Sequence, residues 1–205
     1  LLTLNIGAED TSYKEKMAEA IAQMHRSESL AELQQTANQF SVIARMNPEQ
    51  WLPLYHEAYC YIIMNFVDES GPEAKEGYLD RAEVAIEKMM ELKPEEAEIH
   101  ALHAFYLTGR LVVDPMNRGQ TMAPMIAGAF GKALALDPQN PRARYVKLSN
   151  EMGTARFFGS DISSYCREAK KILEEWDAYP VKSELHPDWG KDLVGELSAS
   201  CTENE

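Results

Sequence analysis

Apolar residues recur at steps of three and four along most of the chain, which is the spacing of one buried face on an α-helix. No run of useful length alternates apolar and polar residues as a β-strand would, and residues 111–113 form an extended linker at most. The pattern predicts an all-α fold of about nine helices. Clear examples of the spacing are Tyr13, Met17, Ala20 and Met24, and Tyr165, Ala169, Ile172 and Trp176.

Four prolines divide this helical pattern at regular intervals. They are Pro48, Pro94, Pro138 and Pro180, which stand 46, 44 and 42 residues apart. The residue before a proline is disfavoured in the α conformation, so each proline is expected to follow the end of a helix. A near-constant period in this range is typical of stacked helix pairs.

Three of the segments before these prolines share one pattern of small and apolar residues. The positions twelve, eight and five residues before the proline hold Ala82, Ile86 and Met89, then Ile126, Phe130 and Ala133, and Thr36, Phe40 and Ile43. This pattern resembles the second helix of the tetratricopeptide repeat, and Trp51 and Leu54 in PEQWLPLYHEAY resemble its first helix. The resemblance covers about residues 30–180. It implies antiparallel helix pairs stacked as a short solenoid that binds proteins or peptides on its concave face.

The chain also departs from that family. Thr36 and Ile126 stand where the family has alanine, Met89 is large, and Glu168 and Glu175 fill the small positions before Pro180. Each repeat is longer than the usual period of about 34 residues, so we expect long loops between the two helices of a pair. HEAT-like helix pairs, whose period is closer, are the alternative fold. The expected loops are residues 65–77, 109–124 and 153–161.

We expect one helical-repeat domain over residues 11–200, with a capping helix and tail over residues 185–205. Residues 1–10 are expected to be flexible, and LLTLNIGAED resembles the end of a signal peptide with a small residue, Ala8, at the cleavage point. Three further stretches resemble a group of small exported bacterial tetratricopeptide-like proteins of unassigned function. These stretches are VDPMNRGQ, RFFGSD and HPDWG. The chain is therefore expected to be exported, to the periplasm, with a cytoplasmic location as the alternative.

Charge and cysteine usage narrow the classes of partner and compartment. The formal net charge of −13 disfavours binding to nucleic acid or to an anionic membrane surface. No apolar run reaches the roughly 18 residues of a membrane-spanning helix. Cys60 and Cys166 fall inside apolar helical patterns, where buried free thiols are common. With Cys201 they form no even set and no CxxC, so we expect no disulfide.

No catalytic motif stands out. GxSxG, HExxH and GxxxxGK[ST] are all absent, and His100 and His103 lie three residues apart with no third metal ligand in view. We therefore predict no enzyme activity, no cofactor and no metal, and a protein or peptide as the partner. Two alternatives are kept: an enzyme or small-ligand-binding protein that uses the inter-helix loops, and a structural component of a cell-envelope assembly.

Two sets of candidate site residues follow. The face of the first helices opposite the packing stripe should line the concave groove and offer aromatic and polar side chains to a peptide. The alternative for Tyr59 and Phe105 is that they pack under the next repeat. In the stretch RLVVDPMNRG, Arg110 and Arg118 could each pair with Asp114 as a structural brace, or bind an anion. The FFG of residues 157–159 could fill a seam or form an exposed aromatic patch. The groove candidates are His56, Tyr59, Phe105, Thr108, Arg142, Tyr145 and Ser149.

Overall fold

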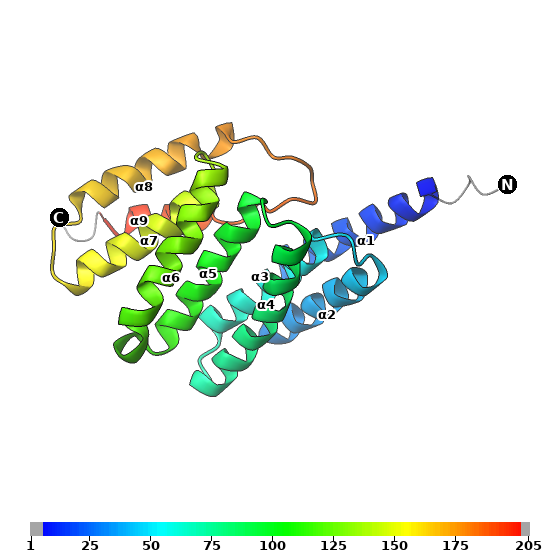
Figure 1. Cartoon of the computed structure of the whole chain (residues 1–205), viewed down its shortest axis with the longest axis horizontal. Helices are drawn as coiled ribbons and strands as arrows, with labels where there is room; N and C mark the ends of the chain where they lie inside the picture. The colour runs from blue at the N-terminus through cyan, green and yellow to red at the C-terminus, as the bar shows by residue number, and fades with distance from the viewer. Residues whose placement is uncertain (1–5, 202–205) are drawn as a thin grey trace. The chain divides into compact units, whose positions relative to one another are not determined.

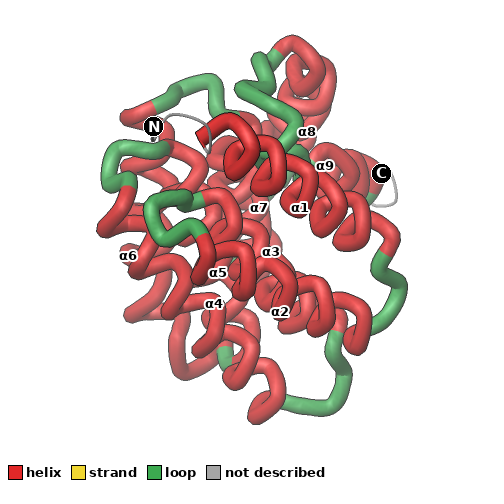
Figure 2. The backbone as a smooth tube through the Cα atoms, turned by 90° about the vertical axis from the view of Figure 1, so that its right-hand side faces the viewer, coloured by secondary structure: helices red, strands yellow, loops and turns green. Residues whose placement is uncertain are grey.

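Helices joined by turns make up almost all of the computed structural model, which describes residues 6–201 (Figure 1). The described residues form nine α-helices and one short 3-10 helix, and no strand appears in this part of the backbone (Figure 2). The all-α prediction is therefore confirmed. The elements are α1 Ile6–Arg26, α2 Leu30–Met46, α3 Leu52–Val67, α4 Pro72–Leu92, α5 Ala97–Val113, α6 Pro115–Leu136, α7 Pro141–Phe157, α8 Ser163–Glu175, η1 Trp176–Ala178 and α9 Lys191–Ala199.

The repeated prolines end helices as the sequence predicts. The helices α2, α4 and α6 stop one residue before the pre-proline positions Asn47, Lys93 and Asp137. At these positions φ is −133°, −142° and −144°, outside the helical range. The steric clash between the proline ring and the preceding residue explains this departure.

The prediction of long loops between the two helices of a pair is wrong. Residues 68–71 separate α3 from α4, Asp114 alone separates α5 from α6, and residues 158–162 separate α7 from α8. The additional residues of each repeat lengthen the helices instead. Pro72 and Pro115 each start a helix at its first turn, where a missing N–H is not needed, and the Asp114 carboxylate caps α6 by accepting from Asn117 N.

The described chain divides into two compact units. Unit 1 contains the residues up to Pro94 together with Ser183–His186, and unit 2 contains Glu95–Lys182 and the residues from Pro187 onward. Inside unit 1 the helices α1 to α4 pack in chain order. Inside unit 2, α5 packs against both α6 and α7, α7 packs against α8, and α8 packs against α9. A single repeat domain over residues 11–200 stays a prediction.

The first helix includes part of the segment expected to be flexible. The helix α1 begins at Ile6 and so covers residues 6–10, while residues 1–5, and with them most of the expected signal-peptide remnant, lie outside the described residues. The small residue at the expected cleavage point, Ala8, falls within α1.

The repeat positions form the core of the helix pairs. Eight of the nine residues in the shared pattern are buried, among them Thr36, Phe40, Ile86 and Ala133. Phe130 differs, since it is only partly buried. A ring that the repeat pattern places in the core therefore reaches solvent on unit 2, beside a groove described below.

A buried ion pair joins α5 to α7 in unit 2. Glu98 on α5 accepts two hydrogen bonds from the Arg142 guanidinium on α7, with Nε 2.6 Å from Oε2. Asn140 donates to the same carboxylate at 2.7 Å. Arg142 was expected on an open concave face, but the pairing places its side chain inside the fold, where 6% of it is exposed.

The C-terminal segment is fixed by a tight turn and a disulfide. Gly190 has φ of +110°, and a Cβ there would lie 2.7 Å from the Trp176 ring, so the turn into α9 requires glycine. Cys166 on α8 is bonded to Cys201 just after α9. Our expectation of no disulfide is wrong, because the packing of α9 against α8 brings together two cysteines 35 residues apart. Cys60 is buried and free, as expected.

Candidate functional site

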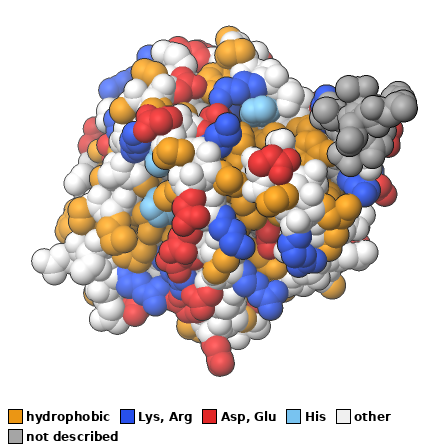
Figure 3. All heavy atoms as spheres, turned by 45° about the vertical axis from the view of Figure 1, so that its right-hand side comes forward, with side chains coloured by type: hydrophobic (Ala, Val, Ile, Leu, Met, Phe, Trp, Pro, Cys, Tyr) orange, Lys and Arg blue, Asp and Glu red, His pale blue; other side chains and the backbone are white. Residues whose placement is uncertain are grey.

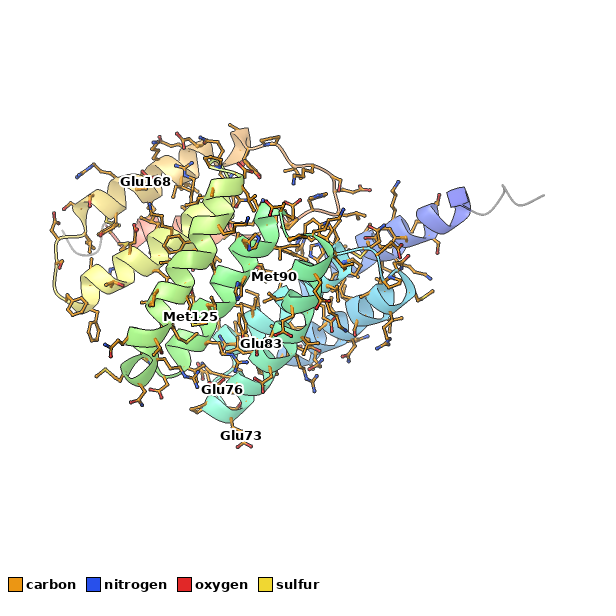
Figure 4. All side chains as sticks on the ribbon, viewed as in Figure 1. Glu73, Glu76, Glu83, Met90, Met125 and Glu168 are labelled. Atoms are coloured by element: carbon orange, nitrogen blue, oxygen red, sulfur yellow. A yellow bond between two sulfur atoms is a disulfide. The ribbon has the colours of Figure 1, made fainter. Side chains whose placement is uncertain are left out.

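An open groove runs along unit 2 between α6, α7 and α8, and Leu111 of α5 is also in its lining. It consists of two adjoining hollows that share Glu151 and Tyr165. In Figure 4, Met125 marks α6 and Glu168 marks α8, two of the helices that flank the groove. One hollow, of about 540 Å³, is lined by Leu111, Ala123, Ile126, Ala127, Phe130, Asn150, Glu151, Thr154, Ala155, Phe158, Ser160, Asp161 and Tyr165. The other, of about 460 Å³, is lined by Leu134, Pro138, Arg144, Lys147, Leu148, Glu151, Ser164, Tyr165 and Glu168.

The larger hollow presents apolar and aromatic surface. We call it the apolar hollow. Phe158 follows the last residue of α7 and is 74% exposed, and Phe130 and Tyr165 add two further rings to the lining. Large exposed apolar side chains gathered beside a concave surface are typical of a ligand or partner site. Of the two interpretations of residues 157–159, the exposed aromatic patch is the one that the structure bears out.

The smaller hollow carries the positive charge of the groove, and we call it the basic hollow. The Arg144 guanidinium donates to Glu175 at 2.7 Å and to Glu168 at 3.1 Å. Burial lowers the pKa of Arg144, but the hydrogen bonds to the two carboxylates outweigh it and raise the pKa overall. The second cation, Lys147, is 45% exposed, and its Nζ lies 3.9 Å from Glu151 Oε1.

A fixed negative charge lies at the edge of the apolar hollow. The Asp161 carboxylate accepts from the Ser163 hydroxyl at 2.6 Å and from the Ser163 backbone N–H at 3.0 Å. These bonds hold the pKa of Asp161 below its usual value, so the group is ionised at neutral pH. The N-cap position of α8 is Ile162, and Asp161 binds the first residue of the helix, Ser163, from one position further back. The groove therefore combines an apolar surface with charges of both signs.

Unit 1 has a smaller cavity of about 410 Å³. It lies where α1 turns into α2 and contacts the second half of α3. Half of its lining residues are non-aromatic apolar ones, and Tyr59 and His25 are the ring-bearing residues. Tyr59 is thus the predicted groove residue that the structure places beside a cavity.

The other predicted groove residues lie inside the fold or against it. His56, Phe105, Arg142 and Tyr145 are buried. Thr108 and Ser149 are partly buried, and Thr108 accepts a hydrogen bond from Asn150 at 2.9 Å. Their binding role stays a prediction.

The C-terminal segment explains why that face is covered. In unit 1 the backbone carbonyl of Leu185 lies 2.9 Å from His56 Nε2. In unit 2 the Trp189 ring stacks on Phe105 with centroids 4.9 Å apart, and Phe105 meets Tyr145 edge to face. Residues that we expected only to cap the last repeat therefore pack on side chains that we expected to be open.

The stretch RLVVDPMNRG is the junction of two helices. Arg110 Nε donates to the Tyr106 hydroxyl at 2.9 Å, and Arg118 donates to the Arg110 carbonyl at 2.9 Å. The Asp114 carboxylate accepts two hydrogen bonds from the Asn117 side-chain amide, at 2.9 and 3.1 Å. These contacts hold the end of α5 to the start of α6. The pairing of either arginine with Asp114, and anion binding by the two arginines, stay predictions.

The surface, the metal-binding side chains and the hydropathy of the helices give three findings about the described residues. Acidic and basic side chains are interspersed with exposed apolar ones on the face shown in Figure 3. No cluster of three or more His, Cys, Asp or Glu side chains arranged to hold a metal ion occurs between residues 6 and 201. Over the same part of the chain, none of the helices has the length and hydropathy needed to cross a bilayer.

The fold and the groove together define an all-α protein of helices packed in sequence, with a hollow large enough for a small molecule. A solved structure shares this architecture: the HusA haemophore from Porphyromonas gingivalis. The two chains are 27% identical, the likeness covers 94% of each, and the TM-score is 0.80. No protein-family model and no curated protein matches the chain.

Proposed function

We propose that this protein binds and carries a ligand of the porphyrin class, haem or its metal-free precursor, in the groove of unit 2. The likeness to a haemophore over 94% of both chains, at 27% identity, carries the proposal. It favours small-ligand binding, which the sequence offered as an alternative, over a scaffold that binds only peptides. A carrier of this kind needs no catalytic group, which agrees with the prediction of no enzyme activity.

The groove fits such a ligand in size and chemistry. A porphyrin is a flat, largely apolar ring, and small-molecule sites are typically apolar clefts of about 300–1,000 Å³. The apolar hollow has a volume of about 540 Å³ and offers Phe130, Phe158 and Tyr165 to the faces and edges of such a ring. Aromatic contacts of this type stabilise a complex by about 0.5–1.5 kcal/mol beyond the buried area.

Tyr165 is the residue that we propose could bind haem iron. Proteins hold haem iron through His, Cys, Met or Tyr side chains. Of these four types, only tyrosine occurs in the lining of the two hollows, and Tyr165 belongs to both. A porphyrin ring in the apolar hollow would therefore have a phenol oxygen as its candidate axial ligand.

Binding can be tested by titrating the protein with protoporphyrin IX and with haemin, followed by fluorescence quenching and absorbance. Phe158→Ser should weaken the Kd for both ligands about ten-fold, because it removes one aromatic contact of the ring. Val181→Ser is the control: Val181 is 63% exposed and lines neither hollow, so this variant should bind like the wild type. Absence of binding by the wild type, or equal loss in both variants, would contradict the proposal.

Tyr165→Phe separates iron binding from ring binding. The substitution keeps the aromatic ring and removes the oxygen, so the affinity for haemin should fall about ten-fold, while that for protoporphyrin IX stays within two-fold. The haem absorption bands should shift at the same time, because the axial ligand changes. A loss of equal size for the two ligands would assign Tyr165 to packing against the ring instead.

We also propose that the protein acts outside the cytoplasm, in the periplasm. The Cys166–Cys201 disulfide supports a compartment outside the cytoplasm, since such bonds persist in oxidising environments.

We propose as well that the helix pairs form a tetratricopeptide-like arrangement. The spacing of Pro48, Pro94 and Pro138, at which the pairs end, and the burial of the pattern residues support it. A protein or peptide partner stays a prediction.

A further inference from the structure

We propose that the groove selects acidic porphyrins over neutral ones, and that Lys147 is the residue that binds a carboxylate of the ligand. This inference rests on the proposed function and names the ligand class of the same site. Protoporphyrin and haem carry two carboxylate arms on one edge of an otherwise apolar ring. The groove is divided in the same way. One hollow has a mainly apolar lining, and the other contains both basic residues of the groove, Arg144 and Lys147.

Lys147 is the more exposed and the less engaged of the two cations. Arg144 is only 14% exposed and is bound to two carboxylates at 2.7 and 3.1 Å. Lys147 Nζ is 3.9 Å from Glu151, too far for a hydrogen bond. An ammonium group has three donors, and a ligand carboxylate can therefore bind Lys147 without displacing an existing short contact.

The position of Lys147 on α7 places it beside the apolar hollow. Residues four apart on a helix are neighbours on one face, and Glu151, four residues after Lys147, belongs to the walls of both hollows. A ring lying in the apolar hollow would therefore have its carboxylate arms within one helical turn of the ammonium group. This arrangement also orients the ring, with its acidic edge toward the basic hollow.

The charge balance of the groove makes Lys147 decisive for an acidic ligand. The lining of the two hollows contains the carboxylates Glu151, Asp161 and Glu168 and the two cations. Since Arg144 is already paired with Glu168 and Glu175, Lys147 is the positive charge that stands against Glu151 and Asp161. Its loss would change the formal charge of the lining from −1 (2−3) to −2 (1−3) and remove the cation nearest to the ligand carboxylates, whereas a neutral ester would be little affected.

The test compares protoporphyrin IX with its dimethyl ester, delivered in dilute detergent, at low and high salt. Lys147→Met keeps the length and the apolar stem of the side chain and removes the charge. We expect the Kd of this variant to rise about five- to ten-fold for the diacid and less than two-fold for the diester. Lys132→Met is the matched control: Lys132 lies on α6, pairs with Glu95 at 3.2 Å and lines neither hollow, so its affinities should match the wild type.

The wild type should bind the diacid more tightly than the diester, and added salt should reduce this preference. Equal loss of both ligands in Lys147→Met, or an unchanged Kd for the diacid, would overturn the inference while leaving porphyrin binding in place. If the wild type binds neither compound, the proposed function fails and this inference fails with it. The two failures are therefore distinguishable.

Discussion

Replacing Glu98 with glutamine should lower the free energy of unfolding by about 3–5 kcal/mol, because it leaves the buried Arg142 charge without its partner. The carboxylate is 3% exposed and the guanidinium 6%. A loss of this size is a large share of the roughly 5–15 kcal/mol that stabilises a typical domain. Urea unfolding followed by circular dichroism measures it directly.

The surroundings of the pair explain why the loss should be large. Asn140 donates to Glu98 at 2.7 Å and accepts from Ala143 N at 2.9 Å, so it ties the carboxylate to the start of α7. The Tyr179 hydroxyl donates to Asp137 at 2.6 Å, and its ring lies under the Arg142 guanidinium. Burial and the hydrogen bond to Asp137 raise the pKa of Tyr179, which keeps this hydroxyl protonated as a donor at neutral pH.

A double variant provides the control. Glu98→Gln combined with Arg142→Met removes both charges and keeps an acceptor for Asn140, so it should be more stable than Glu98→Gln alone. Strictly additive losses, or a single-variant loss below about 1 kcal/mol, would show that the pair does not stabilise unit 2 through its charges. The outcome also bears on Arg142 as a binding residue, since a side chain that holds the core is not free to meet a partner.

Local patterns predicted the helices of this fold well. Each of the repeated prolines ends a helix because the clash that its ring makes is strictly local, and the core positions follow from a three-to-four spacing. The predicted loop lengths were wrong because proline is common both in turns and in the first turn of a helix. Pro72 and Pro115 start helices, whereas we took the stretches around them to be turns.

The candidate site was less predictable because it depends on contacts between distant segments. The predicted face is covered by Leu185 and Trp189, which follow the last repeat, and spacing within one helix carries no information about them. The groove of unit 2 had one visible signal, the FFG at residues 157–159, where Phe158 lines the apolar hollow. A second signal was a departure from the repeat, Ile126 in place of alanine, which also lines that hollow.

Reducing the Cys166–Cys201 disulfide should lower the free energy of unfolding by about 3–4 kcal/mol, since the bond closes a loop of 35 residues. The effect should be concentrated on α8, which buries two side chains, Ala169 and Ile172, and so depends on its tether to the segment after α9. Urea unfolding with and without a reductant measures the loss.

The Cys166→Ser, Cys201→Ser double variant is the matched control. Its stability should equal that of the reduced wild type, and the reductant should have no further effect on it, because the remaining cysteine, Cys60, is buried and free. Burial raises the pKa of the Cys60 thiol to about 12, so it does not supply a thiolate for exchange at neutral pH. A wild type whose stability is unchanged on reduction would contradict the prediction. The predicted loss also links stability to compartment. Cys166 directly follows the groove residue Tyr165 on α8, and a reducing environment would loosen the helix that carries both.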